Sequence, residues 1–232
     1  MTEANDRFFF DTISDKFENI RSQYDVQRRL EIVFEELLPE SLEGRRVLDA
    51  GCANGRFSCL AIARKANVTS FDISHSLVVQ AHKNKYVDKP VTSDVLAMPF
   101  ADKEFDIVIS SEVIEHVMYP RQAIKEMSRV LKPGGILALT CPNRLWEWPI
   151  QISTKLGLRY SLGYERFPGF TELEVMITQS GLRLETNFGF HPWPFQLRSL
   201  QNLSRHVDHY AGKNLWGKAM INQAIRAVRA SI

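Results

Sequence analysis

Three side chains suited to acid-base or metal chemistry stand close together in the sequence. Glu112, Glu115 and His116 follow the run Phe105-Asp106-Ile107-Val108-Ile109-Ser110-Ser111, whose β-branched and apolar residues predict a buried strand. They occupy relative positions 0, 3 and 4, so on a helical turn they share one face. Two carboxylates and an imidazole on one face can bind a divalent cation such as Mg²⁺. The alternatives for His116 are a general base and a side chain held by hydrogen bonds in the packing.

A turn containing two glycines, earlier in the chain, indicates a ligand site. The segment Val47-Leu48-Asp49-Ala50-Gly51-Cys52-Ala53-Asn54-Gly55 passes from a buried strand through small residues into the helical pattern of residues 56–65. No Gly-Lys-Ser/Thr closes it, and its glycines are not spaced as in the dinucleotide motif GxGxxG. Asp49 would repel a pyrophosphate, so the turn favours a ligand with an ammonium or sulfonium group.

The turn resembles the first motif, hhDhGCGxG, of the class I S-adenosylmethionine (SAM) dependent methyltransferases. One position departs from that motif, because Ala53 stands where the middle glycine usually is. The resemblance implies a Rossmann-like fold with SAM as the cofactor. It implies that the turn binds SAM through Asp49, Gly51, Cys52, Ala53 and Gly55.

Two further acids follow short apolar runs. Asp72 lies 21 residues past Gly51, where a β-α-β unit places the carboxylate that binds ribose hydroxyls. The alternative for Asp72 is a cap on the helix that begins near Ser74. In the resembled family an acid at the position of Asp94 faces the adenine amino group and the next backbone amide contacts the ring; the alternative is a turn residue. The predicted cofactor set is completed by Ile73, Val95 and Ser111.

Strand and helix patterns alternate from residue 47 to residue 141 with short connections. This alternation predicts an α/β fold with a doubly wound parallel sheet, helices on both faces and ligands at the carboxyl ends of the strands. The resemblance extends the prediction to a mostly parallel seven-stranded sheet with an insertion after the fifth strand. Residues 221–228 are a candidate for its last strand, although their Ala, Gln and Arg content equally suits a helix.

The 232 residues are predicted to form one domain. Apolar spacings of three and four within residues 1–40 indicate amphipathic helices, and in the resembled family such a segment covers the cofactor as a lid, with Tyr24 the predicted lid contact. Residues 44–141 are the predicted cofactor-binding core. Residues 142–232 are the predicted acceptor-site insertion and C-terminal part, whose aromatic residues suit a flat or apolar acceptor.

The spacing of Glu112, Glu115 and His116 also resembles the ExxEH pattern of quinone-biosynthesis O-methyltransferases and of small-RNA 2′-O-methyltransferases, which implies Mg²⁺ at these side chains. The RNA enzymes add a histidine after the fifth strand, yet no histidine occurs between His116 and His191. His191 follows the strand pattern of residues 182–190 and could reach the pocket, which makes it the second catalytic candidate.

Composition limits the classes of binding partner and the cellular compartment that we expect for this protein. The net charge is +2, which is too near neutral to argue for polyanionic partners, and nucleic acid is not an expected partner. Three cysteines without a CxxC pair favour a reducing compartment, and no apolar run approaches about 18 residues, so we expect a cytoplasmic protein without a membrane span. The oligomeric state is left open.

The leading hypothesis is therefore a SAM-dependent methyltransferase acting on a small molecule, at a hydroxyl oxygen. The alternatives are metal-dependent RNA ribose 2′-O-methylation and a non-catalytic binding module that keeps the fold as a scaffold.

Overall fold

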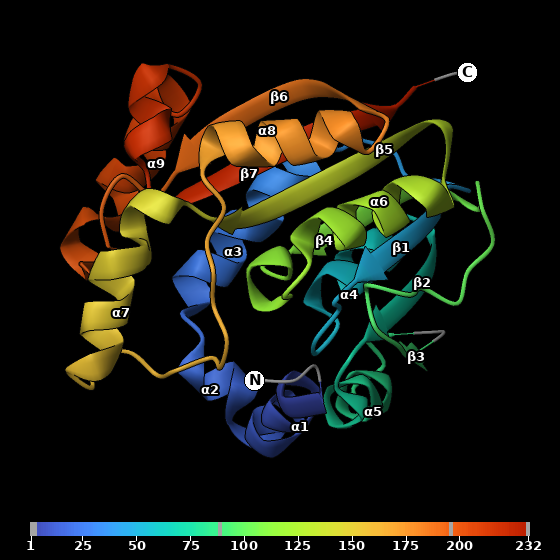
Figure 1. Ribbon diagram of the computed structural model, residues 1–232, viewed down its shortest axis with the longest axis horizontal. Helices are drawn as coiled ribbons and strands as arrows, with labels where there is room; N and C mark the ends of the chain where they lie inside the picture. The colour runs from blue at the N-terminus through green and yellow to red at the C-terminus, as the bar shows by residue number, and fades with distance from the viewer. Residues whose placement is uncertain (1–3, 88–89, 195–196, 231–232) are drawn as a thin grey trace.

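A seven-stranded sheet forms the centre of the computed structural model, which describes residues 4–87, 90–194 and 197–230 (Figure 1). Its strands are β1 (Arg46–Ala50), β2 (Asn67–Asp72), β3 (Pro90–Thr92), β4 (Phe105–Ser111), β5 (Leu131–Pro142), β6 (Leu182–Phe190) and β7 (Asn222–Arg229). The strand order is β3-β2-β1-β4-β5-β7-β6, with β3 to β5 parallel and β7 antiparallel to both its neighbours. The predicted doubly wound, mostly parallel α/β fold is confirmed. Its strand order reverses between β1 and β4, where such sheets bind ligands.

The last strand resolves the ambiguity of residues 221–228, because Asn222–Arg229 forms a β-strand and not a helix. β7 lies between β5 and β6, and pairs Ile225 with Leu139 on one side and with Asn187 on the other. Its small side chains Ala224 and Ala227 are fully buried. A strand hydrogen-bonded along both edges needs little intrinsic β-propensity, because its neighbours determine its conformation.

Helices cover both faces of the sheet. On one face, in front in Figure 1, α6 (Pro120–Val130) and α8 (Phe170–Gln179) bury Ile124 and Leu173. On the other face, α3 (Gln23–Glu31), the π-helical segment η2 (Ile32–Leu37) and α4 (Arg56–Ala63) form a second core around Phe34. The remaining helical elements are α1 (Ala4–Ile13), η1 (Ser14–Lys16), α2 (Phe17–Ile20), α5 (His75–Lys83), η3 (Ile114–His116), η4 (Arg144–Trp146), α7 (Glu147–Lys155), η5 (Arg198–Leu200), α9 (Gln201–Ala211) and η6 (Leu215–Ala219).

The N-terminal helices are attached to α5 by polar and apolar contacts. The carboxylate of Asp11 accepts hydrogen bonds from the Ser74 hydroxyl at 2.7 Å and from the Ser76 amide at 2.9 Å. Ile13 and Phe17 pack with Leu77 in a third apolar cluster. These contacts hold α1 and α2 beside the turn that follows β1.

No helix within the described ranges is both long enough and apolar enough to cross a lipid bilayer.

Candidate active site

A cavity of about 990 Å³ opens where the sheet reverses its strand order. It is lined by the N-terminal helices, by the carboxyl ends of β1, β2 and β4, by the segment after β3 and by residues after β5. Gln201, Ile221 and Asn222 from the C-terminal part of the chain complete the lining. Its size lies near the upper limit of small-molecule sites, which is roughly 1,000 Å³. One cavity therefore brings together the predicted lid, cofactor turn and ExxEH segment.

Residues of the turn after β1 line the cavity, and two of them, Gly51 and Ala53, have backbone conformations that side chains rarely adopt. Gly51 has φ +78°, and a Cβ there would stand 2.3 Å from the Val113 Cγ2 atom. Ala53 adopts φ +46°, and its methyl packs beside the apolar cluster of α1 and α2, so the departure from the glycine motif adds a contact to the N-terminal helices. Asn54 is 5% exposed, and its Oδ1 has no hydrogen-bond partner among the described residues.

Two residues predicted to bind the cofactor are absent from the cavity lining. Gly55 packs against other residues of the protein and not against the cavity. A Cβ at this position would stand 2.8 Å from Val87 and 2.9 Å from Tyr86. Asp49 is 2% exposed, and its Oδ2 accepts a hydrogen bond of 2.5 Å from the Ser58 hydroxyl on α4. Burial raises the pKa of Asp49 to about 6. Its place beneath the turn corrects the expectation of a direct ligand contact.

Asp72 and Asp94 both line the cavity and also organise local backbone. The two oxygens of Asp72 accept hydrogen bonds from the amides of Ala53 at 2.8 Å and of Ser74 at 2.9 Å. Burial raises the pKa of Asp72, although these two amides oppose the shift. Asp94 accepts a bond from the Leu96 amide at 2.8 Å. The turn role considered for Asp94 is therefore observed, whereas the cap of α5 is Ser74, whose hydroxyl accepts a hydrogen bond from the Leu77 amide at 3.2 Å. Both acids also line the cavity, as a ligand role requires.

The ExxEH segment does not form the helical face that its spacing predicted. Glu112 has φ +57°, and only Ile114–His116 forms a short 3₁₀ turn. The Glu112 carboxylate accepts hydrogen bonds from Thr140 and Asn222, each at 3.3 Å. His116 Nδ1 lies 2.9 Å from the Tyr164 carbonyl and therefore donates its proton to it, while Nε2 lies 3.9 Å from Glu115 Oε1.

The Mg²⁺ site predicted from these three side chains is not formed. Across residues 4–87, 90–194 and 197–230, no group of three or more His, Cys, Asp or Glu side chains stands close enough to hold a metal ion. The left-handed backbone at Glu112 breaks the helical spacing on which the prediction rested. Burial raises the pKa of Glu112 and, together with the Glu112 charge, raises that of Glu115 well above its usual range.

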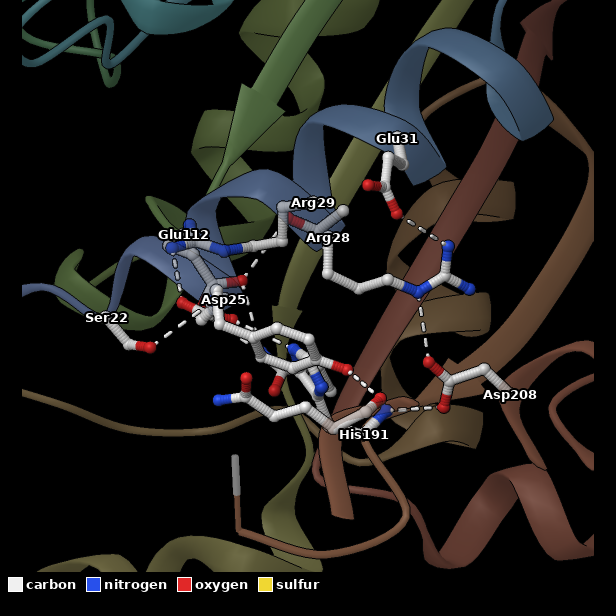
Figure 2. A network of polar contacts seen from close by, with 12 residues as sticks. Ser22, Asp25, Arg28, Arg29, Glu31, Glu112, His191 and Asp208 are labelled. Atoms are coloured by element: carbon white, nitrogen blue, oxygen red, sulfur yellow. Dashed lines mark hydrogen bonds and ion pairs between the residues drawn. The ribbon is translucent and has the colours of Figure 1, made fainter. Parts of the chain in front are cut away.

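A buried ionic network joins α3 to the C-terminal part of the chain (Figure 2). Arg29 Nη2 lies 2.6 Å from Asp25 Oδ2, one helical turn away, and Arg28 Nε lies 3.0 Å from Asp208 Oδ2 on α9. The His191 amide donates to the other Asp208 oxygen at 2.8 Å. Burial alone would raise the pKa of Asp25, but pairing with Arg29 holds it well below its usual range.

The same network explains where Tyr24 and His191 lie. Tyr24 lines the cavity, and its hydroxyl donates to the Gln201 carbonyl at 2.8 Å. His191 is fully buried outside the cavity lining, with Nε2 3.1 Å from Asp25 Oδ1. The expected access of His191 to the pocket is therefore not observed, because Asp25 stands between them.

Sequence reasoning missed several polar side chains of the cavity wall, namely Asp25, Arg29, Asn54 and Asn222. The spacing of Asp25 and Arg29 at i and i+4 on a helix was a usable signal for an ion pair. Asn222 gave none, because its contact to Glu112 depends on a strand 110 residues further along the chain.

Comparison with known proteins agrees with this geometry. Residues 48–139 match a family model described as a methyltransferase domain. The chain is 31% identical over 181 residues to the ubiquinone biosynthesis O-methyltransferase of Coxiella burnetii, covering 72% of this chain and 75% of that protein. It is 36% identical over 95 residues to a malonyl-[acyl-carrier protein] O-methyltransferase of Enterobacter lignolyticus, covering 41% of this chain and only 38% of that protein.

A solved structure of a SAM-dependent methyltransferase from Thermotoga maritima has the same fold, with a TM-score of 0.69 at 22% identity over 96% of this chain and 99% of that one. The cavity at the strand-order reversal, the acid at the end of β2, the acid after β3 and these relatives lead to one assignment. This chain belongs to the class I S-adenosylmethionine-dependent methyltransferases.

Proposed function

We propose that the chain transfers a methyl group from SAM to a hydroxyl oxygen of a small-molecule acceptor. The observation that carries the proposal is the cavity of about 990 Å³, whose lining includes both the turn after β1 and Glu112, Glu115 and His116. It has room for a cofactor and a small second molecule, in agreement with the usual range of ligand sites. Both named relatives act as O-methyltransferases, which supports oxygen as the methylated atom.

The cavity wall fits the cofactor chemically. The unpartnered Oδ1 of Asn54 suits an ammonium group, and Asp72 keeps lone pairs for two ribose hydroxyls beyond those used by backbone amides. Asp94 and the Val95 amide would bind the adenine ring. The proposed cofactor-binding residues that line the cavity are Tyr24, Gly51, Cys52, Ala53, Asn54, Asp72, Ile73, Asp94, Val95 and Ser111.

His116 is the proposed general base. When bound, SAM supplies a methyl group on a positively charged sulfur, so the protein's main contribution is to align the acceptor oxygen. The Tyr164 carbonyl holds the Nδ1 proton of His116, so the neutral ring presents Nε2 as a proton acceptor. The hydroxyl proton would pass to Nε2 as the acceptor oxygen takes the methyl group.

We assign these roles within one domain, with residues 1–40 as the lid, 44–141 as the cofactor-binding core and 142–232 as the acceptor-site part. The free thiols of Cys52, Cys59 and Cys141 suit a reducing compartment, which supports a cytoplasmic location.

Calorimetry with S-adenosylhomocysteine tests the cofactor site. We expect Asp72→Asn to weaken binding about tenfold or more, because charge-assisted hydrogen bonds to the ribose are lost. The matched control Asp102→Asn changes an exposed side chain and should bind like the wild type. Equal affinities for the two variants would reject the ribose role, and no binding by the wild type would reject the function.

Acceptor methylation is tested by incubating metabolite extracts with isotope-labelled SAM and following label by mass spectrometry. The label should appear as an O-methyl group, and label on nitrogen or carbon alone would reject the oxygen assignment. We expect the same label with a chelator present, since the described side chains form no metal cluster.

A further inference from the structure

Helix α7 exposes its apolar face to solvent. Trp148, Ile152 and Leu156 recur every four residues from the first turn of the helix to its C-cap, and their exposed fractions are 71%, 52% and 68%. No residue of α7 is buried. Because an amphipathic helix normally turns its apolar face to the core, this face is available for another surface.

The exposed apolar surface continues onto η6. Leu215 and Trp216 are 81% and 76% exposed. The Trp146 indole donates to the Ala219 carbonyl at 2.9 Å, which joins the start of α7 to η6, and both elements lie on the left side of Figure 1. We name Trp148, Ile152, Leu156, Leu215 and Trp216 the apolar platform. Large exposed apolar side chains gathered on two joined elements mark an interaction site.

The charges around the platform are positive. Glu147 and Asp208 are the only acids in residues 143–160 and 200–220. Both face inward, since Glu147 accepts a hydrogen bond from the Phe167 amide at 3.1 Å and Asp208 is 4% exposed beside Arg28. Lys155 and Lys218 are exposed and form no ion pair with the described part of the chain.

The combination of exposed tryptophans, aliphatic side chains and lysines without outward acids is complementary to the surface of an anionic lipid bilayer. A second copy of the chain is a poorer occupant, because self-pairing would bring lysines together without acids to neutralise them. We propose that the apolar platform docks on an anionic membrane surface.

Docking in this way would place the cavity beside the bilayer. Ile150, Leu158 and Tyr160 line the cavity and belong to α7 or to the segment directly after it. An apolar acceptor dissolved in the membrane would then enter without crossing water. This last step rests on the proposed function, whereas the docking does not.

Co-sedimentation with lipid vesicles tests the docking. We expect binding to phosphatidylcholine vesicles that contain phosphatidylglycerol, weaker binding to phosphatidylcholine alone, and a decrease with added salt. Ile152→Ser should lower the partition about tenfold, and Lys155→Gln about fivefold. The matched controls Ile62→Ser and Lys125→Gln change exposed residues on α4 and α6 and should bind like the wild type.

Three results would overturn the docking: no binding to either vesicle, equal binding by platform and control variants, or a dimer in light scattering that Ile152→Ser dissociates. Each variant is also tested for S-adenosylhomocysteine binding. Retained binding shows an intact fold, so a failure of membrane docking is distinguishable from a failure of the proposed function.

Discussion

The buried carboxyl of Asp49 should give the protein a pH-dependent stability that a single amide substitution removes. Burial raises its pKa from 3.8 to about 6 in the folded chain, while the unfolded chain keeps the ordinary value. Between these two pH values the folded state holds a proton that the unfolded state has lost, so the free energy of unfolding falls as the pH rises. The pKa difference of about two units corresponds to roughly 3 kcal/mol, fully lost above about pH 6.

Asp49→Asn removes the titration and keeps an oxygen that can accept the hydrogen bond from Ser58. Urea unfolding of both proteins between about pH 3.5 and pH 7 isolates the effect, because other titrating groups cancel in the difference. We expect the variant to gain roughly 3 kcal/mol relative to the wild type across that interval. Parallel stability curves would refute the reasoning, since they would mean that Asp49 titrates alike in both states.

Three further experiments test the packing and the chemistry of the site. Arg28→Met should lower the free energy of urea unfolding by about 3 kcal/mol, because it leaves Asp208 buried without its ion pair, and Arg28→Met with Asp208→Leu should recover most of the loss. Gly51→Ala should abolish S-adenosylhomocysteine binding in calorimetry, since its Cβ would stand 2.3 Å from Val113; binding at wild-type affinity would contradict the close approach. His116→Gln should slow methylation while leaving the affinity for S-adenosylhomocysteine unchanged, and a wild-type methylation rate in this variant would exclude the base role.

The parallel core was predictable because its signals are local. Apolar strands that end in acids or glycines need no distant partner to be recognised, and Asp72 and Asp94 indeed line the cavity. The direction in which a side chain points was harder to predict than the place of its residue at the end of a strand. Asp49 ends β1 as expected, yet its side chain faces Ser58 on α4 and not the ligand side.

The remaining errors come from contacts between distant segments and from one backbone angle. His191 is held by Asp25, 166 residues earlier, and no sequence pattern records that pair. Glu112 leaves the helical spacing because its φ is +57°, an unusual angle for a glutamate that its neighbours impose. The tertiary environment of β7 likewise overrides its own composition.

The position of β7 in the sheet also affects how the chain folds while the ribosome synthesises it. Among the described strands, β6 bonds within the sheet to β7 alone, and the Glu112 carboxylate receives one of its hydrogen bonds from Asn222 on β7. While the ribosome has not yet released this strand, β5 has an open edge and the cavity wall is incomplete. Such late, long-range pairing slows folding and leaves an edge that other chains can join. Nascent chains stalled before residue 222 should therefore need chaperones more than the finished protein does.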